Sequence, residues 1–165
     1  MNIKLERLKQ LVSYDPHSGL FVWRVNKRGR FARHGTLAGS KDSRGYIRLT
    51  LDQKFHYAHR LAWFYMTGDF PSCIDHINAN KSDNRICNLR IATSAENQQN
   101  RTQSSRNNKS GLLGVSPFGD KWRATIYLNN KQIYLGLYLT KDQAKDAYLK
   151  AKRKFHPYAW LSKTS

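Results

Sequence analysis

The chain has 165 residues, 39% of them hydrophobic and 12% aromatic, and its 29 Lys and Arg against 11 Asp and Glu give a formal charge of +18. This composition can form a buried core, which argues against a disordered chain, and no apolar run approaches the roughly 20 residues of a membrane span. So large a positive charge favours nucleic acid as the partner and gives no reason to expect a membrane.

The charge and the cysteines are distributed unevenly. Residues 1–70 carry 13 basic and 5 acidic side chains, residues 71–100 carry 3 of each, and residues 101–165 carry 13 and 3. Two basic arms therefore flank a neutral centre, which indicates that the centre does something other than hold phosphate. Cys73 and Cys87 form no CxxC pair, so a four-cysteine zinc site is excluded and no structural zinc is expected.

The first part of the chain predicts a basic leader of one helix and several strands. Apolar spacing predicts a helix over 3–13, and a basic, glycine-punctuated stretch over 26–44 is a candidate phosphate-contacting arm. Strands are expected over 20–25, 46–51 and 55–59, and a helix over 60–67 that ends at Gly68.

The centre predicts the order strand, loop, strand, helix. Short strands are expected over 73–77 and 88–92, with a polar loop over 78–85 between them. Residues 93–96 (Thr-Ser-Ala-Glu) form a capping box, which begins a helix at Thr93.

The last part of the chain predicts a small sheet packed on one helix. Residues 103–110 have no apolar periodicity and are interpreted as a linker. Three antiparallel strands are expected over 112–116, 122–128 and 132–138. A second capping box at Thr140 begins a helix whose alanines share one face.

Four central residues are candidates for a metal-dependent active site. Asp75 and Asn97 offer a carboxylate and an amide oxygen, which suit a hard cation such as Mg²⁺ that keeps several waters. The adjacent His76 can accept a proton from an attacking water, because the ordinary pKa of imidazole lies near neutrality. Asn88 is expected to hold the loop through its amide. Each of these residues, taken alone, is more often an ordinary polar side chain than part of an active site. The hypothesis therefore rests on the four residues together.

The central pattern resembles the phage HNH homing endonucleases. The resemblance rests on His59-Arg60-Leu61-Ala62-Trp63, on Ile74-Asp75-His76-Ile77-Asn78-Ala79-Asn80-Lys81-Ser82-Asp83-Asn84-Arg85, on Asn88-Leu89-Arg90 and on Thr93-Ser94-Ala95-Glu96-Asn97. It implies a ββα-metal nuclease core at 59–102 after a basic leader at 1–58. In that core Asp75 and Asn97 would bind Mg²⁺, with Mn²⁺ able to substitute, His76 would be the general base and Asn88 would hold the hairpin loop. Asn97 stands where other branches carry His, which disfavours zinc or nickel.

The tail resembles the Apetala-type DNA-binding domain over 111–165. The resemblance rests on Gly114-Val115-Ser116, Trp122-Arg123-Ala124, Tyr134-Leu135-Gly136-Leu137-Tyr138, Thr140, Ala144 and Ala147-Tyr148. It implies that the three-stranded sheet lies in a major groove of DNA.

Alternation along the middle strand predicts which side chains of the tail face DNA. Arg123, Thr125 and Tyr127 fall on one face, and Trp122, Ala124 and Ile126 on the other. Arg123 is expected either to contact a guanine edge or only a phosphate, and the tyrosines either to meet DNA or to pack on the sheet. The candidate DNA-binding residues of the whole chain are Arg28, Arg30, Arg33, Lys81, Arg85, Arg101, Ser116, Lys121, Arg123, Thr125, Tyr127, Gln132 and Tyr134.

Together these patterns predict a modular α+β protein that binds double-stranded DNA as a monomer in the cytoplasm of a phage-infected bacterial cell. The predicted activity is a site-specific, homing-type DNA endonuclease that hydrolyses a phosphodiester and nicks one strand. The alternatives are a sequence-specific DNA-binding regulator with an inactive nuclease fold, and an RNA-binding protein, for which no RNP-type or GXXG signature is present.

Overall fold

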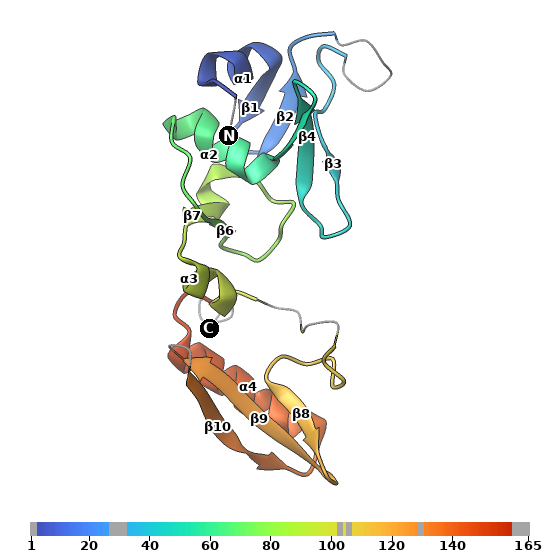
Figure 1. Ribbon diagram of the computed structural model, residues 1–165, viewed down its shortest axis with the longest axis vertical. Helices are drawn as coiled ribbons and strands as arrows, with labels where there is room; N and C mark the ends of the chain where they lie inside the picture. The colour runs from blue at the N-terminus through green and yellow to red at the C-terminus, as the bar shows by residue number, and fades with distance from the viewer. Residues whose placement is uncertain (1–2, 27–32, 102–103, 105–106, 129–130, 160–165) are drawn as a thin grey trace. The chain divides into compact units, whose positions relative to one another are not determined.

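The computed structural model describes residues 3–26, 33–101, 104, 107–128 and 131–159 and divides into two compact units, Met1–Ile91 and Ala92–Ser165 (Figure 1). Both units mix helix and sheet, as the α+β class predicts. The first unit contains α1 (Leu5–Leu11), β1 (Val12–Asp15), β2 (Leu20–Trp23), β3 (Ser40–Lys41), β4 (Ile47–Leu51), β5 (Lys54–Tyr57), α2 (Ala58–Thr67), β6 (Ile74–His76), the 3₁₀ turn η1 (Ile86–Asn88) and β7 (Leu89–Ile91). The second contains α3 (Ser94–Gln99), β8 (Val115–Phe118), β9 (Lys121–Leu128), β10 (Lys131–Tyr138) and α4 (Lys141–Phe155). Over the described ranges, no helix is both long and apolar enough to cross a membrane.

The first helix is shorter than its apolar spacing predicts. The predicted helix over 3–13 was wrong at its end, because the chain becomes strand β1 at Val12 and pairs antiparallel with β2. Val12 and Tyr14 are both buried on alternate strand positions. The apolar residues near position 12 thus fit the periodicity of a helix and that of a strand, and pairing with β2 selects the strand.

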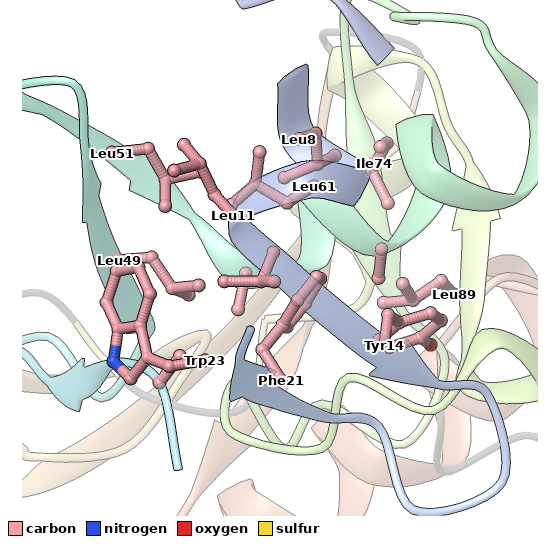
Figure 2. Close-up of a cluster of buried hydrophobic side chains, with 14 residues drawn as sticks. Leu8, Leu11, Tyr14, Phe21, Trp23, Leu49, Leu51, Leu61, Ile74 and Leu89 are labelled. Atoms are coloured by element: carbon pink, nitrogen blue, oxygen red, sulfur yellow. The ribbon is translucent and has the colours of Figure 1, made fainter. Parts of the chain in front are cut away.

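One hydrophobic cluster joins the predicted leader to the central hairpin (Figure 2). Leu8 and Leu11 of α1 belong to the same cluster as Ile74 of β6 and Leu89 of β7. The predicted boundary between residues 58 and 59 falls where β5 runs directly into α2, inside this cluster. The leader therefore supplies part of the core on which the central hairpin rests.

The second sheet of the first unit has the order β3-β4-β5. Strands β4 and β5 and the turn between them lie close to their predicted positions, and α2 ends at Gly68 in the left-handed conformation, as predicted. Strand β3 was not predicted, because its two exposed residues carry no hydrophobic alternation.

The central order of strand, loop, strand and helix is confirmed. Strands β6 and β7 pair antiparallel, with Asp75 opposite Arg90 and His76 opposite Leu89. The predicted capping box begins α3, since Thr93 Oγ1 accepts the Glu96 amide at 3.2 Å and Glu96 Oε2 accepts the Thr93 amide at 2.6 Å.

The second unit contains the predicted sheet and helix in addition to α3. The sheet has the order β10-β9-β8, all pairs antiparallel, and α4 packs against one of its faces (Figure 1). Ala124 and Ile126 are buried on that side, together with Ala144, Tyr148 and Ala151 of the helix. The predicted capping box between Thr140 and Gln143 is also present.

Candidate active site

The predicted metal ligand Asp75 is buried on β6 and paired with an arginine across the hairpin. Its Oδ2 accepts Arg90 Nη2 at 2.8 Å and Nε at 3.2 Å. The two residues are direct cross-strand partners, with side chains 8% and 16% exposed. A charge-assisted pair of this kind fixes the direction of the carboxylate within the hairpin.

The predicted base, His76, follows Asp75 on the same strand and is 4% exposed. Its Nε2 lies 3.2 Å from Asn84 Oδ1, and its ring contacts those of His59 and Tyr46, with centroids 5.0 and 6.0 Å away. Burial lowers the pKa of His76 below its ordinary value, and the hydrogen bond to Asn84 only partly opposes this. The imidazole is therefore neutral at neutral pH and able to accept a proton.

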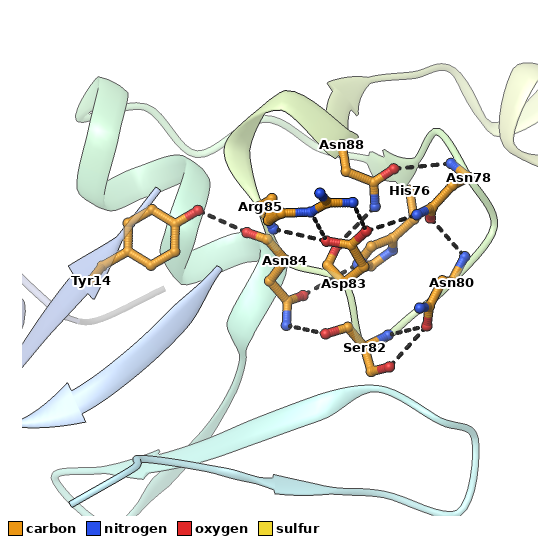
Figure 3. A network of polar contacts seen from close by, with 9 residues as sticks. All are labelled: Tyr14, His76, Asn78, Asn80, Ser82, Asp83, Asn84, Arg85 and Asn88. Atoms are coloured by element: carbon orange, nitrogen blue, oxygen red, sulfur yellow. Dashed lines mark hydrogen bonds and ion pairs between the residues drawn. The ribbon is translucent and has the colours of Figure 1, made fainter. Parts of the chain in front are cut away.

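The loop between β6 and β7 is held by side-chain amides (Figure 3). Asn88 Oδ1 accepts the Asn78 amide at 3.0 Å, and Asn88 Nδ2 donates to the Asp83 carbonyl at 2.8 Å. Asn88 itself is buried at the end of η1. One side chain thus ties both limbs of the loop, which is what a loop-holding residue must do.

A carboxylate within this loop engages one of the predicted DNA contacts. Asp83 accepts Arg85 Nη2 at 2.6 Å and Nε at 2.8 Å, and it also accepts Asn78 Nδ2 at 2.7 Å. The hydrogen bond from Arg85 is the main cause that lowers the pKa of Asp83 to about 2. Arg85 is therefore already paired with a carboxylate in the chain without DNA. Lys81, another predicted contact, donates to the Arg44 carbonyl at 3.2 Å.

The predicted site residues are divided between the two units. Asp75, His76 and Asn88 lie in the first unit, whereas Asn97 lies on α3 in the second, with an exposed side chain. Where the structure describes the chain, no three His, Cys, Asp or Glu side chains gather into a metal-holding group. Asp75 offers a carboxylate and Asn97 an amide oxygen, and oxygen donors of these kinds suit Mg²⁺. The joint ligation by Asp75 and Asn97 stays a prediction.

Comparison with known proteins assigns a family to this segment. Residues 56–99 match the HNH endonuclease family. An HNH endonuclease domain lies there. The chain is also 35% identical over 78 residues to Protein 3.8 of Escherichia phage T7, a match that covers 45% of this chain and 64% of that protein, just under two thirds. No solved structure matches the chain.

The matched range runs from β5 to α3 and contains Asp75, His76, Asn88 and Asn97. It supports the HNH nuclease family for this segment. The homing type, the identity of the metal and the Apetala-type tail stay predictions.

Three groups of residues at the site were not predicted from the sequence. Arg90 pairs with Asp75 only because of the strand register, which the sequence does not give. Tyr46 and Tyr57 pack with His59, whose pKa burial lowers to about 3. Asn84 was visible in the motif but received no role.

The predicted DNA-facing side chains of the tail lie on one face of the sheet, away from α4. Arg123 is paired with Ser116, Thr125 with Tyr134, and Tyr127 with Gln132 across neighbouring strands. Tyr127 and Tyr134 are 62% and 59% exposed, so packing against the sheet does not explain why tyrosines stand at these positions. The predicted face is confirmed; its contact with DNA stays a prediction.

The remaining predicted DNA contacts lie outside this face. Arg33 and Arg101 are exposed, in the first and second unit respectively. Arg28 and Arg30 lie outside the described residues.

Proposed function

We propose that this protein is a site-specific, homing-type DNA endonuclease that uses one Mg²⁺ ion and a histidine base to nick a DNA strand. The observation that carries the proposal is the Asp75–His76 pair on β6. A buried carboxylate, oriented by Arg90, directly precedes a buried neutral imidazole, and both lie within the HNH domain.

Asp75 and Asn97 are the residues that would hold the cation. A bound Mg²⁺ ion supplies charge stabilisation for the scissile phosphate and the leaving 3′-oxygen. The oxygen donors suit Mg²⁺ and allow Mn²⁺ to replace it, whereas neither residue offers the imidazole or thiolate that zinc prefers.

His76 is the general base of the proposed reaction. It takes a proton from a water molecule whose oxygen attacks phosphorus, and the bond from phosphorus to the 3′-oxygen breaks. The leaving oxygen takes up a proton from solvent water, and the products are a 5′-phosphate and a 3′-hydroxyl. Neutrality at working pH is required for this role, and the lowered pKa of His76 provides it.

The basic surfaces of both units would hold the DNA. The open face of the β8–β10 sheet presents Arg123 beside Ser116 and two exposed tyrosines, a combination that suits a groove and its phosphates. One active site and a separate binding sheet suit a monomer that nicks. We place the activity in the cytoplasm of a phage-infected bacterial cell.

The test is the conversion of supercoiled DNA to relaxed circles at low salt, with Mg²⁺ or EDTA. We expect relaxed circles with the wild-type protein and Mg²⁺, none with EDTA, and a loss of about 100-fold or more with His76→Ala. His17→Ala is the matched control, because His17 is exposed and lies outside the HNH domain. Phage DNA is used beside plasmid, since a plasmid can lack the target.

The competing function is a DNA-binding regulator with an inactive nuclease fold. It predicts a gel shift of the same DNA without any relaxation, with Mg²⁺ present and with Mn²⁺ in its place. That result on phage DNA would overturn the endonuclease.

A further inference from the structure

We propose that Asn84 is a positioning residue, which holds His76 as the tautomer protonated on Nε2 and leaves the basic lone pair on Nδ1. The role in catalysis rests on the proposed nuclease function. The tautomer itself does not, because it follows from the contact between Asn84 and His76.

The direction of the Asn84 amide fixes which atom faces the imidazole. Asn84 Nδ2 lies 3.2 Å from the Ser82 carbonyl oxygen, which can only accept a hydrogen bond, so the NH₂ group points there. The amide oxygen Oδ1 must then point the other way, and it lies 3.2 Å from His76 Nε2. An amide oxygen can only accept, so Nε2 must carry the proton. Figure 3 shows both contacts.

The surroundings make this arrangement hard to reverse. Asn84 is 3% exposed and His76 4%, so water cannot easily replace either partner. The other tautomer would set the Nε2 lone pair against Oδ1, two buried acceptors without a proton between them, which is unfavourable.

The backbone of Asn84 is fixed from a different part of the unit. Its carbonyl oxygen accepts Tyr14 Oη at 2.7 Å, from β1. A Cβ atom at Gly19 would lie only 2.5 Å from the Asn84 carbonyl carbon, so the β1–β2 turn lies directly against this residue. The leader hairpin therefore holds the residue that orients the base.

The tautomer can be read directly by long-range ¹H–¹⁵N correlation spectra of the metal-free full chain labelled in histidine, recorded above the titration range of imidazole. We expect a single His76 signal set with protonated Nε2 and unprotonated Nδ1. A wild-type spectrum with the proton on Nδ1, or with both tautomers, would overturn the inference, whether or not the protein cuts DNA.

Two substitutions of similar size test the acceptor itself. Asn84→Leu removes it, so we expect the Nε2–H signal to exchange or broaden and the cleavage rate at saturating DNA to fall about tenfold or more, with DNA affinity unchanged. Asn84→Asp keeps an acceptor, so it should retain the Nε2–H signal and, unlike Asn84→Leu, retain cleavage. An Asn84→Leu protein with a wild-type spectrum and rate would contradict the proposal.

Tyr14→Phe is the structural control. It loses the hydroxyl that supports the Asn84 backbone but keeps the amide acceptor, so the tautomer should be unchanged even if the unit is less stable. A wild-type protein with the predicted tautomer but no cleavage of phage DNA would refute the nuclease function alone.

Discussion

The β6–β7 loop and the open face of the β8–β10 sheet use polar side chains in opposite ways. In the loop, the side chains of Asn88, Asp83 and Asn84 bond to the backbone and to other side chains at 2.6–3.4 Å, and those of Asn88 and Asn84 are buried. On the sheet, the side-chain bonds that join neighbouring strands, 3.4 Å from Arg123 to Ser116 and 3.2 Å from Gln132 to Thr125, are both exposed.

This difference matches the two tasks of a nuclease. Chemistry needs groups that are held in place before the substrate arrives, because reorganisation at that moment is costly. Binding to DNA needs donors and aromatic faces that remain available and can adjust to a groove. The loop should therefore tolerate change poorly, and the sheet face should tolerate it well in stability but not in affinity.

The largest effect is expected where the loop meets the leader hairpin. At Gly19, φ is +73° and a Cβ would lie 2.4 Å from Arg85 N, so Gly19→Ala must displace backbone. We expect a loss of about 3 kcal/mol or more in the free energy of unfolding, measured by urea denaturation. Gly35→Ala, at φ +81° with open space around it, isolates the backbone strain and should cost only about 1 kcal/mol. Equal losses would show that the close approach is unimportant.

Acid should destabilise the first unit through His59. Its pKa is about 3 in the folded chain against an ordinary 6.5, so the unfolded chain binds the proton first as the pH falls. The stability is present above pH 6.5 and is lost from there toward pH 3, by about 1.4 kcal/mol per pH unit. Urea titrations across this range should show a shallower dependence for His59→Phe than for the exposed control His17→Phe. An unchanged slope in His59→Phe would contradict the assignment.

Loss of the Asn88 amide should be smaller but should affect both stability and activity. Asn88→Ala leaves the Asn78 amide and the Asp83 carbonyl without their partner, which costs about 2 kcal/mol. Cleavage should fall with it, because the loop carries Asn84. Asn80→Ala in the same loop removes only exposed bonds and should cost well under that amount. A reversed order would refute the loop-holding role.

The smallest effect on stability is expected on the sheet face. Arg123→Ala should weaken DNA binding about tenfold, which is about 1.4 kcal/mol of binding free energy. The salt dependence of binding should fall by the equivalent of roughly one phosphate contact. The free energy of unfolding should change by less than about 0.5 kcal/mol. Lys150→Ala on α4 removes the same charge from an exposed position and should leave binding nearly unchanged. Fluorescence anisotropy with labelled duplex measures the affinity of both variants. Equal losses of affinity would show that the sheet face contributes only general positive charge.

Much of this organisation could be predicted because local signals agreed with the fold. The capping boxes at Thr93 and Thr140 and the alternation along β9 depend on neighbouring residues only. The end of α1 could not be predicted, since residues near Val12 fit helix and strand alike. Arg90 and Asn84 were missed for a related reason. Their roles come from strand register and from the direction of one amide, which arise only when distant segments meet.

The division of labour is tested most directly by single-turnover cleavage at saturating protein, comparing His76→Ala with Arg123→Ala. Saturation removes differences in affinity, so the rate then reports the chemical step. We predict that Arg123→Ala cleaves at the wild-type rate and that His76→Ala remains about 100-fold slower or more. A His76→Ala protein that regains the wild-type rate would contradict chemistry in the first unit, and an Arg123→Ala protein that stays slow would contradict a binding role for the sheet.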